Sequence, residues 1–116
     1  MTDGLGSWQS AFLEGVRLIT LAQYVPGPAA IARMVAWGAS ALKIEPPEGD
    51  PLASSNPAWY TALTAGQEVV RLDLKDAADR ARLDERLADA DVLLTSSRPG
   101  ALGRLGLDPK ALRLRF

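Results

Sequence analysis

One stretch of this 116-residue chain, residues 15–45, constrains its fold more than any other. It begins and ends with a short apolar run of the kind that forms a buried strand, and these runs contain Ile19 and Leu42. Between them, Pro28 suits the first turn of a helix, and Gly38 suits the residue that follows its end. A strand, a helix and a second strand in so few residues predict a βαβ unit, in which the strands are parallel and the crossover is right-handed.

The rest of the chain continues this alternation. Residues 46–51 hold three prolines and are predicted to form a surface loop. The elements predicted after it are a short helix capped at Asn56 and Pro57, a strand at 69–72, a helix from Asp76 to about Ala90, a strand at 92–94, and short helices after Pro99 and Pro109. Before the βαβ unit, Trp8, Phe12 and Leu13 are expected to pack onto the domain. Strands that alternate with helices predict an α/β fold with a mostly parallel sheet.

Composition narrows the classes of partner and chemistry. The net charge of −1 and the isoelectric point near 5.3 argue against nucleic acid as a partner. No apolar run approaches the ~20 residues that a membrane helix needs, so no membrane partner is expected. Without cysteine we expect no disulfide framework and a cytoplasmic location. Because histidine is absent too, thiol catalysis, histidine-activated serine nucleophiles and zinc sites built on these ligands are excluded.

A ligand of such a sheet is expected at the carboxyl ends of the strands. In this chain those ends are the loops at residues 23–28, 46–51, 73–76 and 95–100. Unpaired amides at the start of the helices after Pro28 and Pro99 would favour an anion, and Lys75, Arg98 and Arg104 could supply positive charge. The alternative interpretation is that these charges are solvated and that the loops are plain connectors.

Three motifs occur in order along the chain: K-I-E-P-P-x-G-D-P at residues 43–51, L-D-L-K at 72–75 and R-P-G-x-L-x-R-L-G-L at 98–107. Together with the βαβ stretch they resemble the amino-terminal part of the family III CoA-transferases, the group that holds formyl-CoA transferase, carnitine CoA-transferase and α-methylacyl-CoA racemase. The resemblance covers residues 12–116. It implies that residues 1–116 are the amino-terminal part of a CoA-binding, Rossmann-like large domain. Its sheet would hold about four strands with flanking helices, and would be incomplete relative to the family.

The resemblance also implies that CoA lies across the sheet ends. Residues that match by position fall into groups: Tyr24, Val25 and Pro26 would lie against the cofactor, Leu72 would flank the adenine, Lys75 and Arg104 would approach the phosphates, and Ser96, Ser97 and Arg98 would line the same side. For each of these residues a structural role remains open. Leu72, for example, would then be a core residue, and Arg98 would pair with a neighbouring carboxylate.

The chain departs from the family pattern at three places. Residues 64–68 replace an Asn-Arg-x-Lys-Arg-like segment, and we expect Glu68 to lie near the pyrophosphate and repel it. Ser96 and Ser97 stand where Asn-Phe is common, which removes an aromatic surface. The aspartate that forms the covalent intermediate belongs to a later segment of the family, so no catalytic residue is assigned.

The function implied by the resemblance is transfer of CoA from an acyl-CoA donor to a carboxylic acid, with the chain as an amino-terminal fragment or a degenerate relative. The alternatives are a non-catalytic CoA-binding or partner module and an inactive remnant. The expected small-molecule partners are acyl-CoA or CoA. Because the strand at 92–94 is almost entirely apolar, we also expect self-association or a second chain that supplies the missing part.

Overall fold

Four parallel strands form the centre of the fold in the computed structural model, which describes residues 12–116. They follow the order β3-β2-β1-β4 across the sheet, and their bounds are β1 (Arg17–Thr20), β2 (Ser40–Glu45), β3 (Glu68–Arg71) and β4 (Val92–Leu94). All three pairings between neighbours are parallel. The α/β prediction is therefore confirmed, and each strand lies within a residue or two of its predicted position.

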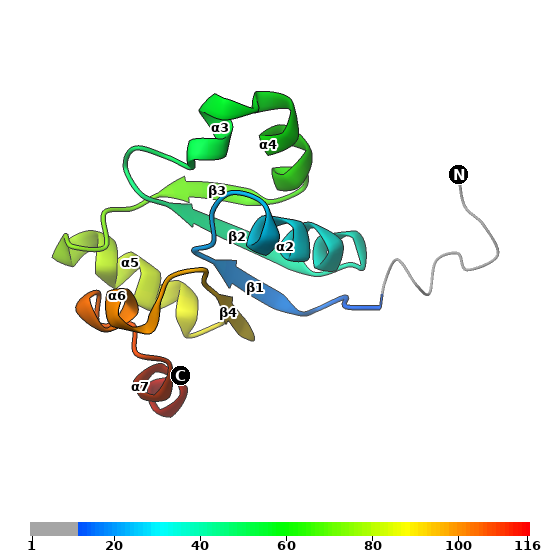
Figure 1. Cartoon of the computed structure of the whole chain (residues 1–116). Coiled ribbons are helices and arrows are strands. Elements are labelled where there is room, and N and C mark those ends of the chain that lie inside the picture. Colours follow the sequence, from blue (N-terminus) through cyan, green and yellow to red (C-terminus); the bar gives the residue numbers. More distant parts are fainter. Residues whose placement is uncertain (1–11) are drawn as a thin grey trace.

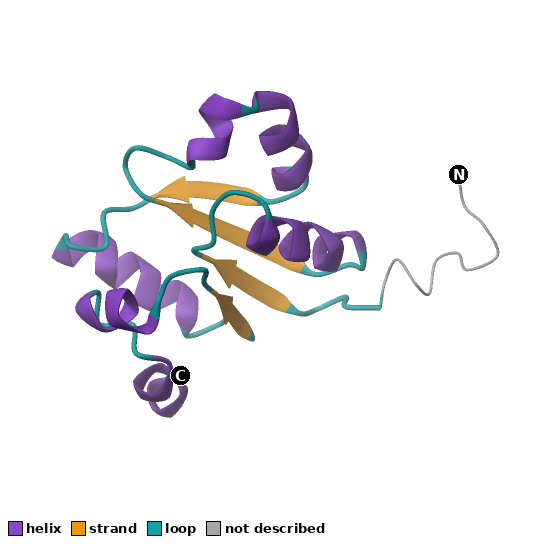
Figure 2. Ribbon diagram, viewed as in Figure 1, coloured by secondary structure: helices purple, strands orange, loops and turns teal. Residues whose placement is uncertain are grey.

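Helices cover both faces of this sheet. In Figure 1, α2 lies in front of the sheet and α5 lies behind it, while Figure 2 shows the same alternation of helix and strand by colour. The helices of the described part are α2 (Pro26–Ala36), α3 (Pro51–Ser55), α4 (Pro57–Thr64), α5 (Ala77–Leu87), α6 (Pro99–Arg104) and α7 (Pro109–Arg115). No helix in residues 12–116 has the length and apolar character needed to cross a bilayer.

Capping side chains begin the helices where the sequence predicts them. Asn56 accepts the Trp59 N–H at 3.1 Å, and Asp76 accepts the Asp79 N–H at 3.0 Å. Two predicted boundaries are wrong. α2 begins at Pro26 rather than near Pro28, and Pro51 begins α3 rather than ending a loop. In both cases the proline occupies the first helical position, where a missing N–H costs nothing.

The core is divided between the two faces of the sheet. Ile19 and Leu42 face α5 and pack against Leu83 and Leu87, and all four side chains are at most 5% exposed. On the other face, a smaller cluster contains Leu18, Ile31, Ala39 and Ala41. Burial of each large aliphatic side chain contributes about 1.5–3 kcal/mol, so the larger cluster dominates the apolar stabilisation. Toward the carboxyl ends of β1 and β2, the sheet face that carries the smaller cluster becomes polar, with Thr20, Lys43 and Glu45 buried there.

The edges of the described sheet are β3 and β4. Val92 of β4 is 42% exposed, so this apolar strand lies at an edge and is not covered on both sides. α7 packs next to it through Leu112, although Leu114 remains 91% exposed. Trp8 lies outside the described residues, whereas Leu13 packs as expected and the ring of Phe12 meets that of Trp37 edge-on.

Candidate functional site

A groove of about 410 Å³ lies at the carboxyl ends of the strands, where the sheet topology predicts a ligand. We call it the carboxyl-end groove. Each of the four expected loops contributes to its wall: Gln23 follows β1, Pro46 and Pro47 follow β2, Lys75 follows β3, and Ser97 follows β4. Segments that are far apart in the sequence therefore meet at one place because all four strands run in the same direction.

Three of the nine predicted site residues line this groove, namely Leu72, Lys75 and Ser97. Leu72 is 7% exposed and also belongs to the larger apolar cluster, so it is a core residue that reaches the groove wall. Lys75 is exposed, and its backbone N–H donates to Asp73 Oδ1 at 3.0 Å, which fixes the turn that carries it. Lys75 is thus held in the groove lining by a turn that its own backbone N–H closes.

The turn that follows β1 adjoins the groove through Gln23 rather than through the predicted residues. Tyr24 is 52% exposed, and neither it, Val25 nor Pro26 is among the lining residues. The Gln23 N–H donates to Ser96 Oγ at 3.4 Å, so Ser96 joins this turn to the loop after β4. Contact between residues 24–26 and a cofactor stays a prediction.

Arg98 and Arg104 lie on α6 and outside the groove lining. Both are exposed, and Arg98 is the residue before the first turn of α6. Arg104 Nη1 lies 3.7 Å from the point where a Cβ on Gly100 would be, so this side chain turns back along its own helix. Their approach to a phosphate therefore also stays a prediction.

Side-chain caps are absent from two helices of the described part, α2 and α6. These are the helices whose amides were predicted to favour an anion. The other helices in residues 12–116 each have an Asp or Asn side chain that accepts a backbone N–H of the first turn. In α2, Pro26 and Pro28 lack an N–H, which leaves Gly27 as the donor between them.

The charges around the groove are mixed. Lys75 is the cation of the lining, and Glu45, Glu48 and Asp73 supply carboxylates. Glu45 is committed to other partners, as described below, whereas Glu48 is exposed. This arrangement can hold a ligand with an apolar part against Leu72 and an anionic group against Lys75.

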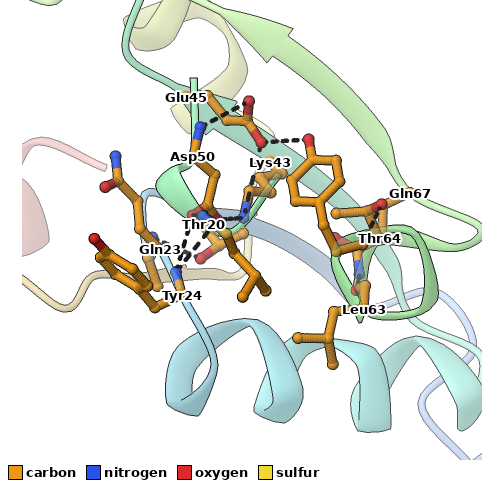
Figure 3. Close-up of polar contacts among 12 residues, drawn as sticks. Thr20, Gln23, Tyr24, Lys43, Glu45, Asp50, Leu63, Thr64 and Gln67 are labelled. Atoms are coloured by element: carbon orange, nitrogen blue, oxygen red, sulfur yellow. Dashed lines mark hydrogen bonds and ion pairs between the residues drawn. The ribbon is translucent and has the colours of Figure 1, made fainter. Parts of the chain in front are cut away.

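Sequence reasoning missed a buried polar cluster beside the groove. It joins Tyr60 to Lys43, Glu45 and Asp50, the last three of which are labelled in Figure 3. Lys43 Nζ donates to Asp50 Oδ2 at 2.5 Å and lies 3.9 Å from Glu45 Oε2. The Tyr60 O–H donates to Glu45 Oε2 at 2.5 Å. Lys43, Glu45 and Asp50 are at most 2% exposed. The two carboxylates share the Lys43 ammonium as their opposite charge, which offsets the cost of burying them.

The pKa values follow from these contacts. Burial alone would raise the pKa of Asp50, but the Lys43 ammonium and the Leu52 and Tyr24 amides outweigh it and lower the pKa below its ordinary value. Burial, together with the hydrogen bond to Glu45, raises the pKa of Tyr60 to about 12. No signal in the sequence indicated this cluster, because charged residues at alternate positions of a strand, such as Lys43 and Glu45, normally indicate a solvent-facing side.

Glu68, which was expected to lie near a bound pyrophosphate, lies away from the carboxyl-end groove. Glu68 is the first residue of β3, and the groove is at the last. Its carboxylate pairs with Arg86 at 2.6 Å, and this hydrogen bond lowers the pKa of Glu68. Because parallel strands share one direction, a residue that begins a strand lies at the opposite end of the sheet from this groove, and the effect of Glu68 on a pyrophosphate stays a prediction.

A second groove, of about 590 Å³, lies beside the exposed edge strand. We call it the β4 groove. One side of it is formed by Val92, Leu93 and Leu94, and part of the other by Leu112 and Phe116 of the carboxyl-terminal segment.

Among residues 12–116 no group of Asp and Glu side chains is arranged to hold a metal ion.

Comparisons with known proteins agree with this architecture. A family model described as CoA-transferase family III matches residues 13–116. The chain is 35% identical over 114 residues to the cinnamoyl-CoA:phenyllactate CoA-transferase of Clostridium sporogenes, a match that covers 89% of this chain and 28% of that enzyme. It is 34% identical over 119 residues to the acetyl-CoA:oxalate CoA-transferase of Acetobacter aceti, covering 97% of this chain and 31% of that enzyme.

Solved structures give the same result. The hypothetical protein Rv3272 of Mycobacterium tuberculosis superposes with a TM-score of 0.85 at 31% identity, over 94% of this chain and 31% of that one. A CAIB/BAIF family protein of Brucella suis gives a TM-score of 0.84 at 26% identity, over 91% of this chain and 31% of that one. The chain thus spans less than a third of the length of these relatives. On the family match and these likenesses, the chain belongs to CoA-transferase family III.

Proposed function

We propose that this chain forms part of the CoA cradle of a protein that moves CoA from an acyl-CoA donor to a carboxylic acid. The observation that carries the proposal is the carboxyl-end groove, where Leu72, Lys75 and Ser97 converge from two separate loops. The relatives act on CoA thioesters according to their names, which gives the ligand class. The groove offers an apolar wall and a cation, and CoA presents an apolar adenine face and phosphate groups.

Each part of the groove has a role in this proposal. Leu72 supplies the apolar surface for the adenine, and Lys75 neutralises a phosphate oxygen. Arg98 and Arg104, which extend from the neighbouring helix, swing toward the same phosphates on binding, because exposed arginines exchange partners at little cost. The uncapped first turns of α2 and α6 offer backbone amides to anionic groups nearby.

The transfer step itself is not assigned to a residue of this chain. In such a transfer a carboxylate attacks the thioester carbonyl, which gives a mixed anhydride and the CoA thiolate. The thiolate then attacks the anhydride at the carbonyl of the attacking carboxylate, which releases the donor acid, and the acceptor acid takes CoA by the same two steps in reverse. Asp73 is the aspartate that lines the groove, and its Oδ1 accepts the Lys75 N–H. We therefore assign this chain the binding of CoA and not the chemistry.

Calorimetry with CoA tests the proposal. The comparison is between the wild-type chain and a Lys75→Ala, Arg104→Ala double variant. Exposed charge contacts are each worth ~0.2–1 kcal/mol, so the loss of two should raise the dissociation constant roughly two- to thirtyfold in the variant. The difference should shrink as salt is added, because added ions screen exposed charges.

A second double variant, Arg33→Ala with Lys110→Ala, removes the same charge from positions outside the groove lining. This control should bind CoA like the wild type, apart from a small effect of net charge. Equal heats for the wild type and the Lys75→Ala, Arg104→Ala variant would remove the CoA site from these residues. An absence of heat in all three proteins would remove the proposal altogether.

A partner role is the second candidate, and the exposed apolar edge favours it. Val92 is 42% exposed and Phe116 is 46% exposed, and both border the β4 groove. An uncovered edge strand presents unpaired backbone groups as well as apolar side chains. We propose that this edge is covered by a second copy of the chain or by a polypeptide that supplies further strands.

A further inference from the structure

One buried carboxylate connects three segments beside the carboxyl-end groove. Both oxygens of Asp50 accept the Tyr24 N–H, Oδ1 at 3.2 Å and Oδ2 at 3.3 Å. Oδ2 also accepts from Lys43 Nζ at 2.5 Å, and Oδ1 accepts the Leu52 N–H at 3.0 Å (Figure 3). Asp50 thus joins strand β2, the turn after β1 and the first turn of α3.

The turn after β1 needs such an anchor. Tyr24 has a φ of 66°, which places it in the left-handed region that residues with a Cβ rarely adopt. Its ring is 52% exposed, so side-chain burial does little to hold this conformation. The Asp50 carboxylate instead holds the Tyr24 N–H, and the preceding residue, Gln23, lines the groove.

Capping of α3 does not explain this arrangement. Asn56, Asp76 and Asp108 cap their helices from exposed positions; asparagine carries no charge, and within residues 12–116 neither aspartate forms an ion pair. Asp50 is 2% exposed and is matched by a lysine that is 1% exposed. A buried ion pair costs desolvation that a cap does not require, so the pair must act on more than α3.

We propose that Asp50, with its charge balanced by Lys43, is a positioning residue that holds the turn at Gln23 and Tyr24 in the conformation that CoA binding requires. This inference rests on the proposed function. Lys43 keeps the carboxylate ionised at its buried position, and the ionised form is the better acceptor for the Tyr24 N–H. The same pair fixes the start of α3, so the loops after β1 and β2 are held in a fixed position relative to each other.

Two double variants isolate the acceptor oxygen at position 50, because the loss of the cation beside Glu45 is the same in both. Both carry Lys43→Met, and they differ at position 50, where one has Asp50→Asn and the other Asp50→Ala. The asparagine keeps an oxygen that can accept the Tyr24 N–H, whereas the alanine has none. Hydrogen exchange of the Tyr24 amide is measured in the ligand-free chain, with the Ile19 amide in the core as a reference. Calorimetry then gives the dissociation constant for CoA.

We expect the Tyr24 amide to exchange about fivefold faster in the alanine variant than in the asparagine variant, as loss of one hydrogen bond predicts, while Ile19 exchanges at the same rate in both. The dissociation constant for CoA should rise by a similar factor. Equal exchange at Tyr24, parallel acceleration at Ile19, or equal CoA binding in the two variants would overturn the positioning role. Failure of the wild-type chain to bind CoA would instead overturn the proposed function, and the exchange comparison would still decide whether Asp50 holds the turn.

Discussion

Replacement of Tyr60 by phenylalanine tests the buried cluster through a single hydroxyl group. The Tyr60 O–H donates to Glu45 Oε2 at 2.5 Å, and the ring lies over the Lys43 ammonium at 5.5 Å from its centroid. The Tyr60→Phe change keeps the ring and its contact with Lys43. It removes the proton donor and leaves one oxygen of a buried carboxylate without its shortest hydrogen bond.

The lost hydrogen bond gives the size of the effect. A hydrogen bond to a charged group contributes about 1.5–3 kcal/mol. We therefore expect a loss of about 2 kcal/mol in the free energy of unfolding at neutral pH. Burial and the bond to Glu45 also raise the pKa of Tyr60 from 10.0 to about 12, because the fold disfavours the phenolate.

The direction of the pKa change determines how the stability difference between the two proteins varies with pH. Because the folded state binds the phenolic proton more tightly, this stabilisation is present below pH 10.0 and is lost as the pH rises toward about 12. Urea unfolding of both proteins at one concentration measures the difference at each pH, since association would otherwise shift apparent stability. The wild-type advantage should shrink over that range.

A spectrophotometric titration gives an independent check. The chain has two tyrosines, so the Tyr60→Phe variant retains Tyr24 as its phenol, and the difference between the two titrations belongs to Tyr60. Ionisation of Tyr60 near pH 10.0, or equal stability of the two proteins at neutral pH, would refute the reasoning.

Three further predictions concern packing, activity and assembly. Gly27→Ala places a Cβ 2.3 Å from Ala22 Cβ, so it should lower the stability measured by thermal unfolding by about 1–3 kcal/mol. Gly103→Ala places a Cβ with nothing within 4 Å, so it should raise the stability by up to about 1 kcal/mol. Similar shifts in both variants would contradict the packing at Gly27. The purified chain should not transfer CoA from acyl-CoA to a carboxylic acid, and turnover abolished by Asp73→Asn would show that we have missed the nucleophile. Light scattering at micromolar concentration should give a mass above 12.4 kDa, and a monodisperse mass at that value with cooperative unfolding would show that the chain covers its own edge.

Local signals predicted most of the fold because they act over a few residues. Asp76 and Asn56 accept amides three positions away, and Gly38 adopts a φ of 104° just beyond α2. The burial of Lys43 was not predicted, because a strand lysine usually directs its ammonium group to water. Its burial depends on α4, which brings in Tyr60 from 15 positions beyond Glu45. A contact of that kind is fixed by tertiary packing and not by a local pattern.

The candidate site was predictable to the extent that it depends on strand direction. Parallel strands bring Leu72, Lys75 and Ser97 to one groove whatever their side chains do. The orientation of an exposed arginine follows from local contacts instead, so Arg104 lies along its own helix. Glu68 begins its strand, so the same rule of strand direction places it at the other end of the sheet from the groove.

The order of strands in the sheet also determines when each strand can be added. β1 is an inner strand that pairs with β2 a short way along the chain but with β4 only at the far end of it, through pairs such as Leu18 with Val92. The first pairing closes a loop of roughly 20 residues and the second one of roughly 70, which adds about 1 kcal/mol of loop-closure entropy. The βαβ unit is therefore the natural nucleus of folding. During synthesis β1 remains with one side unpaired until residue 94 has left the ribosome.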